Sequence, residues 1–188
     1  MKTRLALAAV LTGILSLVAC VESAKKTTAD TAIKDAQRAY ADIADQADQY
    51  VPGRAKEVRA AIQEAQNDFN KGDYALAFED ARTLPVKLKA LKTAAAARKD
   101  ELTAQWNELN NSIPGLVSAV QTKLDALAKR RRKLPKGVAD SLATAKQSWT
   151  DASTAFTSGQ LSKALEKASA AKASLIELQA KLGIKPAA

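Results

Sequence analysis

The sequence contains no histidine, and its only cysteine is Cys20. A single cysteine cannot form an internal disulfide, so the fold must be stabilised by packing alone. Catalytic centres of the Ser-His-Asp or Cys-His type are excluded because each requires a histidine. A zinc site would need a shell made only of carboxylates, which is uncommon. These absences argue against most kinds of catalysis, and we expect neither enzymatic activity nor a bound cofactor or metal.

Glycine, proline and aromatic residues are also scarce, with 7 glycines, 5 prolines and aromatic side chains at 4% of the chain. So few turn-forming residues disfavour β folds, which need many hairpins. Alanine, by contrast, accounts for 41 residues. It favours helix and buries little area per residue. We therefore predict slim, closely packed helices rather than a thick core.

The beginning of the chain has the organisation of an export signal. Residues 1–4 are positively charged, and an apolar segment follows from Leu5 to Leu17. This segment is too short to span a membrane comfortably, but it has the length of a signal-peptide core. It ends in Leu17-Val18-Ala19-Cys20, which resembles the lipobox of bacterial lipoproteins.

The resemblance to bacterial lipoproteins covers residues 1–20. It includes the positive charge of the first residues, the length of the apolar segment, the lipobox and the position of that box in the chain. It implies cleavage before Cys20, a diacylglyceryl group on the Cys20 thiol and, usually, acylation of the new amine. Two or three acyl chains anchor a protein durably, whereas one binds only marginally. The alternatives are an ordinary signal peptide with a chance cysteine, or an uncleaved anchor. We expect residues 1–19 to be removed and residues 20–28 to form a lipidated tether, because Glu22 to about Thr28 is polar and lacks periodicity.

Sorting and charge restrict the partners that we expect. In enterobacteria-like sorting, an acidic residue after the lipidated cysteine retains a lipoprotein at the inner membrane. Val21 therefore favours the outer membrane, on its periplasmic side. The net charge is +9, and loss of Lys2 and Arg4 with the signal leaves 27 basic against 20 acidic side chains, or +7. Positive charge favours anionic lipid or wall polymer as partners, and export argues against nucleic acid.

Apolar residues alternate between spacings of three and four almost throughout residues 29–184, which indicates an all-α chain. Pro85 should kink or break one helix, and Ser112-Ile113-Pro114 should start the next. Four aromatic residues lie on the apolar stripes and are expected in the core: Phe69, Trp106, Trp149 and Phe156. We predict an elongated bundle of about six helices, with stripes from Ile33 to Tyr50, Val58 to Phe69, Ala77 to Leu109, Val117 to Leu127, Leu142 to Phe156 and Leu161 to Leu182.

The pattern repeats at an offset of 87 residues, as from Ala65 to Ala152. The repeat predicts two duplicated three-helix units, residues 29–111 and 112–184, each containing an antiparallel hairpin, followed by a tail at 185–188. Chance similarity between alanine-rich helices is the alternative. The matching residues are Ala65, Phe69, Gly72, Ala77, Ala81, Leu88 and Leu91 with Ala152, Phe156, Gly159, Ala164, Ala168, Leu175 and Leu178.

The segment from Phe69 to Ala81 reads Phe-x-x-Gly-x-Tyr-x-x-Ala-x-x-x-Ala and resembles the hairpin of tetratricopeptide-type repeats. It departs from that family in its period, in Ala81 where an aromatic residue is usual, and in the missing closing proline. No peptide-binding groove is therefore carried over. The chain is more broadly similar to small alanine-rich helical lipoproteins. We expect a non-enzymatic interaction or scaffold module whose partner is another envelope protein.

The most distinctive polar cluster is Lys129-Arg130-Arg131-Arg132-Lys133, followed by Lys136. The pattern places it at the end of a helix near Leu134-Pro135, where the helix dipole favours cations, so a structural interpretation is available. Six basic groups in eight residues exceed what capping needs. Around a helix, at least one of them would lie near the buried side with its stem snorkelling. The functional alternative is a site for anionic lipid or wall polymer.

Other charged residues give weaker indications. Glu79-Asp80 and Asp100-Glu101 are adjacent pairs, and adjacent residues on a helix do not face each other, so neither pair should share a site. A second basic stretch and an acidic face are expected to be solvated: Lys87, Lys89, Lys92, Arg98 and Lys99, and Asp35, Asp42, Asp45 and Asp48.

Overall fold

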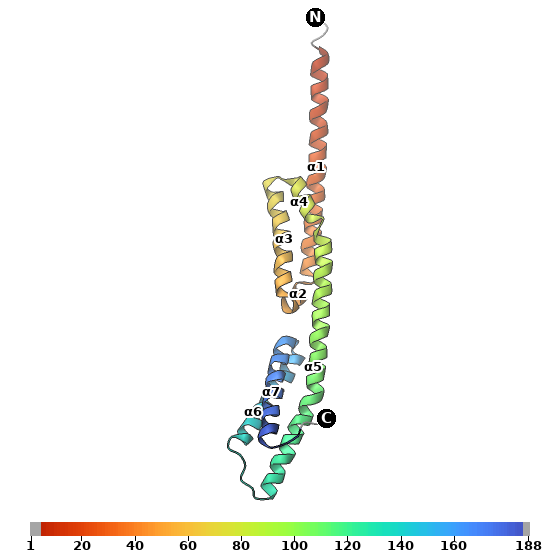
Figure 1. Cartoon of the computed structure of the whole chain (residues 1–188). Helices are drawn as coiled ribbons and strands as arrows, with labels where there is room; N and C mark the ends of the chain where they lie inside the picture. The colour runs from red at the N-terminus through yellow and green to blue at the C-terminus, as the bar shows by residue number, and fades with distance from the viewer. Residues whose placement is uncertain (1–4, 186–188) are drawn as a thin grey trace. The chain divides into compact units, whose positions relative to one another are not determined.

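The computed structural model describes the backbone of residues 5–185 and the side chains of residues 23–185. All regular structure in this range is helical, as Figure 1 shows and as the sequence predicts. The helices are α1 (Leu5–Ala41), α2 (Ala44–Tyr50), α3 (Pro52–Lys71), α4 (Tyr74–Ala81), α5 (Leu84–Lys129), α6 (Val138–Thr157) and α7 (Leu161–Lys181).

Contacts between residues divide the chain into unit 1, which ends at Arg98, and unit 2, which begins at Lys99. The predicted division at 111/112 differs because α5 does not break at Ser112 and contains Pro114 in its interior. A proline inside a helix removes one backbone hydrogen bond, and α5 accommodates that loss. The break expected at Pro85 does occur, since α4 ends at Ala81 and Pro85 lies in the first turn of α5.

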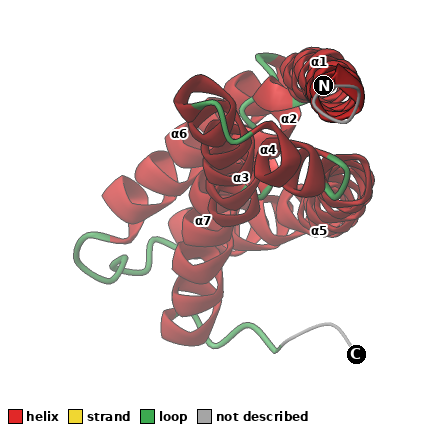
Figure 2. Ribbon diagram, turned by 90° about the horizontal axis from the view of Figure 1, so that it is seen from above, coloured by secondary structure: helices red, strands yellow, loops and turns green. Residues whose placement is uncertain are grey.

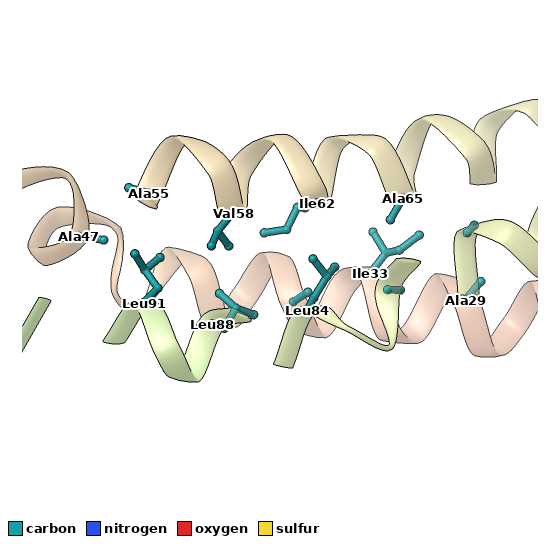
Figure 3. Packing of buried hydrophobic residues seen from close by; sticks show 13 residues of the cluster. Ala29, Ile33, Ala47, Ala55, Val58, Ile62, Ala65, Leu84, Leu88 and Leu91 are labelled. Carbon is teal, nitrogen blue, oxygen red and sulfur yellow. The ribbon is translucent and has the colours of Figure 1, made fainter. Parts of the chain in front are cut away.

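The core of unit 1 joins α1, α3, α4 and the first part of α5. Figure 3 shows Ile33 of α1 and Val58 and Ile62 of α3 near Leu84 and Leu88 of α5. Alanines occupy many of the other buried positions, where their small side chains allow the helix backbones to approach closely. Burial on this scale is modest per residue, so the stability of the unit depends on many small contacts.

The two units contain hairpins whose turns have the same backbone geometry. In both, the glycine after the first helix is left-handed, with φ of 90° at Gly72 and 76° at Gly159. Both turns close with the pair of hydrogen bonds of a Schellman motif, which satisfies carbonyl groups at a helix end. These are Gly72 N–H to Phe69 O and Asp73 N–H to Asp68 O at 3.1 and 3.0 Å, and Gly159 N–H to Phe156 O and Gln160 N–H to Ala155 O at 2.9 Å each.

The second arm of the hairpin is interrupted in unit 1 and continuous in unit 2. Ala77 and its counterpart Ala164 are both completely buried. Beyond them, α7 continues without interruption, whereas unit 1 has a turn between α4 and α5. Lys172 of α7 corresponds to Pro85 at the offset of 87 residues. The proline therefore accounts for the additional break in unit 1, because it has no N–H to donate to the carbonyl of Ala81, four residues earlier, and its ring clashes with that carbonyl in a continuous helix.

The segment expected to form a tether, residues 20–28, is part of the continuous helix α1. The side chains of residues 23–28 are exposed. Two threonine hydroxyls donate to carbonyls four residues earlier, Thr27 to Ser23 at 3.1 Å and Thr28 to Ala24 at 2.8 Å. In Figure 1 this part of α1 extends past the turn between α3 and α4. Helical hydrogen bonding thus organises a polar segment that has no apolar periodicity.

Candidate functional site

Apart from Lys129, which is the last residue of α5, the basic cluster lies on a loop rather than on a helix. α5 ends at Lys129, and the loop leads to α6, which begins at Val138. Residues 129–137 are all exposed, so the expectation that one cation would lie near a buried helix side is wrong. Figures 1 and 2 show this loop projecting from the helices that it connects. We refer to residues 129–136 as the basic loop.

The loop begins with a tight turn in which Arg131 takes the left-handed conformation, at φ 52°. Arg131 N–H donates to Ala128 O at 2.9 Å, and Arg132 N–H donates to Leu127 O at 3.0 Å. This is the same type of cap that the glycine turns of the two hairpins use. Among the described residues, Arg131 is the only non-glycine with positive φ. The turn ends α5 earlier than the position of Leu134-Pro135 led us to expect.

The six cations of the basic loop have no ion pair with any carboxylate among the described residues. The neighbouring acidic residues lie outside the loop, with Asp125 accepting a hydrogen bond from Gln121 at 3.0 Å and Asp140 in the first turn of α6. Leu134 lies within the basic loop and is 38% exposed. The loop thus combines a concentrated positive charge with an apolar side chain at the surface.

Three aromatic rings of unit 2 form a stack. The Trp106 ring lies 5.4 Å from the Trp149 ring and 4.4 Å from the Phe156 ring, with interplanar angles of 17° and 6°. Trp106 is buried, as predicted, but Phe156 is 36% exposed and Trp149 is half-buried. Phe69 of unit 1 is also half-buried and meets Tyr74 edge-on at 5.2 Å. The stack therefore extends from the core of unit 2 to its surface.

A shallow groove of about 520 Å³ lies between α5 and α6 in unit 2. Its lining combines apolar side chains with hydroxyl, amide and amino groups. The Lys146 ammonium donates to the Gln121 side-chain carbonyl across the groove at 2.9 Å. The principal lining residues are Pro114, Val117, Ser118, Gln121, Lys146 and Trp149.

The structure pairs Asp80 with a carboxylate that the sequence analysis did not connect to it. The carboxyl groups of Asp68 on α3 and Asp80 on α4 lie close enough to interact. Burial raises the pKa of the Asp80 carboxyl, and repulsion by Glu64 and Asp68 raises it further. The hydrogen bond to Asp68 raises the pKa of the Lys71 ammonium, whose Nζ lies 2.9 Å from Asp68 Oδ1. The hairpin turn at Gly72 was the signal that could have revealed this pairing.

No group of three or more histidine, cysteine, aspartate or glutamate residues is arranged to hold a metal ion within the described part of the chain.

The remaining charged stretches lie at the surface, as expected. Asp42 and Asp45 are exposed. The other two aspartates form ion pairs, with 3.6 Å between Asp35 Oδ1 and Arg38 Nη1 and 3.0 Å between Asp48 Oδ2 and Arg59 Nη1. The second basic stretch on α5 is exposed at Lys87, Lys89, Lys92, Arg98 and Lys99. Neither group forms a separate site.

The predicted lipidation site lies in α1, and the Cys20 side chain is outside the described side chains. Within the described part of the chain, none of the helices is both long and apolar enough to cross a membrane. No protein-family model, curated protein or solved structure matches the chain.

Proposed function

We propose that this chain is a bacterial lipoprotein, anchored through Cys20 on the periplasmic side of the cell envelope, with the outer membrane favoured by Val21. The observation that carries this proposal is the box Leu17-Val18-Ala19-Cys20 behind a charged start and an apolar segment. The lipid is attached to the thiol group of Cys20.

The body of the lipoprotein acts as a non-enzymatic interaction or scaffold module. The first buried side chain that the structure describes is Ala29. Ala29 lies nine residues after Cys20 on the same helix, which corresponds to about 14 Å at the rise of an α-helix. The body is thus held close to the membrane surface. The groove between α5 and α6, with Trp149 and Lys146 in its lining, offers mixed apolar and polar contacts to a partner protein.

Lipidation is tested by comparing the full chain with its Cys20→Ser variant, each expressed in bacterial cells that have an outer membrane. We expect the parent protein to carry the mass of the lipid and to fractionate with membranes, and the variant to lose both properties. Ser23→Ala, a substitution at an exposed position on the same helix, should retain both. An unchanged mass and membrane fraction for Cys20→Ser would eliminate the proposed anchor.

The scaffold role is tested with photo-crosslinking residues placed in the groove at Ser118 and Thr150, one at a time. We expect a discrete adduct with one envelope protein from these positions. No such adduct should form from Thr93, an exposed position on α5 of unit 1. Absence of adducts from the groove, together with no specific partner in a pull-down from solubilised envelopes, would contradict the proposed role.

A second candidate function is binding of anionic lipid or wall polymer by the basic loop. The observation that favours it is the exposure of all six cations without an ion pair among the described residues. A charge that is paired within a protein must break that ion pair to bind a ligand, which costs free energy. The cations of the basic loop have no such pairs to break among the described residues.

A further inference from the structure

We infer that the basic loop, Lys129 to Lys136, binds the surface of an anionic bilayer, with its cations on lipid phosphates and Leu134 among the head groups. This inference rests on the second candidate function, because it names the anion that the loop binds. It commits to a lipid surface and not to a soluble anionic polymer.

The charge of the loop is suited to a surface carrying many negative groups. Six cations occur within eight residues, and the segment contains no acidic residue. All six are exposed, so they can spread over several phosphates at once. Each lysine or arginine near an anionic membrane raises the affinity of the protein for that membrane about fivefold. Six cations together therefore bind much more tightly than any one of them.

Leu134 distinguishes a bilayer from a dissolved polyanion. It is one of a few large apolar side chains that the structure leaves exposed, at 38%, and it lies directly between Lys133 and Pro135. A hydrated polymer offers no apolar surface for it. The boundary between head groups and acyl chains does, and it is the region where amphipathic helices that combine lysine or arginine with leucine bind.

The backbone around the loop holds this arrangement in place. Both ends are fixed, because Leu124 precedes the loop in the core of unit 2 and Val138, which follows it, is 1% exposed. Arg131 occupies a left-handed position where a glycine would be free of strain. A cation is therefore present at a position where backbone geometry alone favours glycine.

The experiment uses residues 20–188 with Cys20→Ser, so that neither the leader nor the lipid binds vesicles on its own account. All buried residues described lie between Ala29 and Leu182, so this chain retains the described core. Flotation is measured with vesicles of phosphatidylcholine alone and of phosphatidylcholine with phosphatidylglycerol. We expect binding only to the anionic vesicles, weakening as salt is raised. Equal binding to both kinds of vesicle, or binding to neither, would overturn the inference.

Alanine at Arg130, Arg131 and Arg132 together should weaken binding to anionic vesicles on the order of 100-fold. The matched control places alanine at Lys89, Lys92 and Lys99, which removes the same charge from exposed positions on α5. We expect the control to bind within about tenfold of the parent, because it lowers only the overall charge. Both variants should retain the helical circular dichroism of the parent. Equal weakening by the two triple variants would overturn both the inference and the anion-binding role of the loop.

The apolar part is tested separately with Leu134→Ser, compared with Leu76→Ser on α4, where leucine is 51% exposed. We expect about fivefold weaker vesicle binding from Leu134→Ser and no change from Leu76→Ser. Dextran sulfate serves as a soluble polyanion, and its binding should be insensitive to Leu134→Ser. If only the arginine variant weakens vesicle binding, and dextran sulfate binds as tightly as vesicles, the loop recognises polyanions in general. The bilayer inference then fails while the anion-binding role stands.

Discussion

Arg131 has a left-handed backbone conformation, which at other helix ends in this chain is adopted by glycine. Gly72, Gly159 and Gly183 have φ of 90°, 76° and 63°, against 52° at Arg131. The left-handed conformation costs a residue with a Cβ atom roughly 1–2 kcal/mol, because the Cβ approaches the carbonyl oxygen too closely. Arginine at this turn therefore makes the folded protein less stable than glycine would at the same position.

Replacement of Arg131 by glycine should separate this cost from the benefit of the charge. We expect Arg131→Gly to raise the free energy of unfolding by about 1 kcal/mol, measured by urea titration. The same variant should bind anionic vesicles about fivefold more weakly. Arg131→Lys, which keeps the charge and the strain, should change neither quantity appreciably. A fall in stability for Arg131→Gly would show that the arginine side chain has structural contacts that outweigh the backbone strain.

The Asp68–Asp80 pair gives the hairpin of unit 1 a dependence on pH. Burial, and then repulsion from Glu64 and Asp68, raises the pKa of Asp80 in the folded protein. As the pH rises above the ordinary aspartate pKa, the unfolded chain releases this proton before the folded chain does. The contribution of Asp80 to stability is therefore present at acidic pH, and it is lost as the pH rises through the raised pKa.

We expect Asp80→Asn to remove this loss, because the amide stays neutral and can hydrogen-bond to Asp68. Relative to the parent, the variant should gain stability between acidic and neutral pH, as measured by urea titrations across that range. Asp100→Asn, at an exposed position on α5, serves as the control and should show no such pH-dependent gain. A constant difference between Asp80→Asn and the parent at all pH values would contradict the assignment.

The paired hairpins are the elements in which the repeat is most evident. Their turns depend on the conformational freedom of Gly72 and Gly159, and an added Cβ at either position would meet no atom within 4 Å. The expected cost of a side chain there is thus backbone strain alone. Gly115 also has open space around its added Cβ, but it lies inside α5 with ordinary helical geometry.

Alanine substitutions at these glycines should therefore have opposite effects. We expect Gly72→Ala and Gly159→Ala each to lower the free energy of unfolding by about 1 kcal/mol. Gly115→Ala should raise it by about 0.5–1 kcal/mol, because alanine loses less conformational entropy in a helix. Thermal unfolding followed by circular dichroism measures all three. Loss of stability in Gly115→Ala would show that α5 requires glycine near Pro114.

Some elements of the fold are specified by local sequence patterns, and others are not. The hairpins were predictable because their apolar spacing, their glycine turns and the offset of 87 residues all indicated the same structure. The helical conformation of residues 23–28 in α1 was not, because this segment has no apolar stripe. The break expected at Ser112 was wrong, since apolar positions on both sides of Pro114 support one helix.

The candidate sites were predictable only where they are local in sequence. The basic loop is a contiguous run, so its residues were identified, although its conformation was not, because the left-handed turn at Arg131 has no glycine to indicate it. The Asp68–Asp80 contact joins two helices and depends on how the hairpin closes. The groove lined by Trp149 and Pro114 likewise requires the packing of α6 on α5, which periodicity does not specify.

At the scale of the whole molecule, the two units have separate cores and also share one helix. The hydrophobic cluster of unit 1 contains residues from Ala29 to Leu91 only. Both tryptophans of the chain, Trp106 and Trp149, lie in unit 2, and the three tyrosines, Tyr40, Tyr50 and Tyr74, lie in unit 1. Tryptophan fluorescence therefore reports on unit 2 alone.

Separate cores predict separate unfolding transitions. Ile33→Ala, at a position 1% exposed in unit 1, should destabilise that unit by about 2–5 kcal/mol. We expect an earlier urea transition in circular dichroism, with the tryptophan midpoint unchanged. Leu175→Ala, at a fully buried position of unit 2, should instead lower the tryptophan midpoint. An equal shift of the tryptophan midpoint by both variants would mean that α5 couples the units into one cooperative structure, since α5 is the helix that contributes residues to both cores.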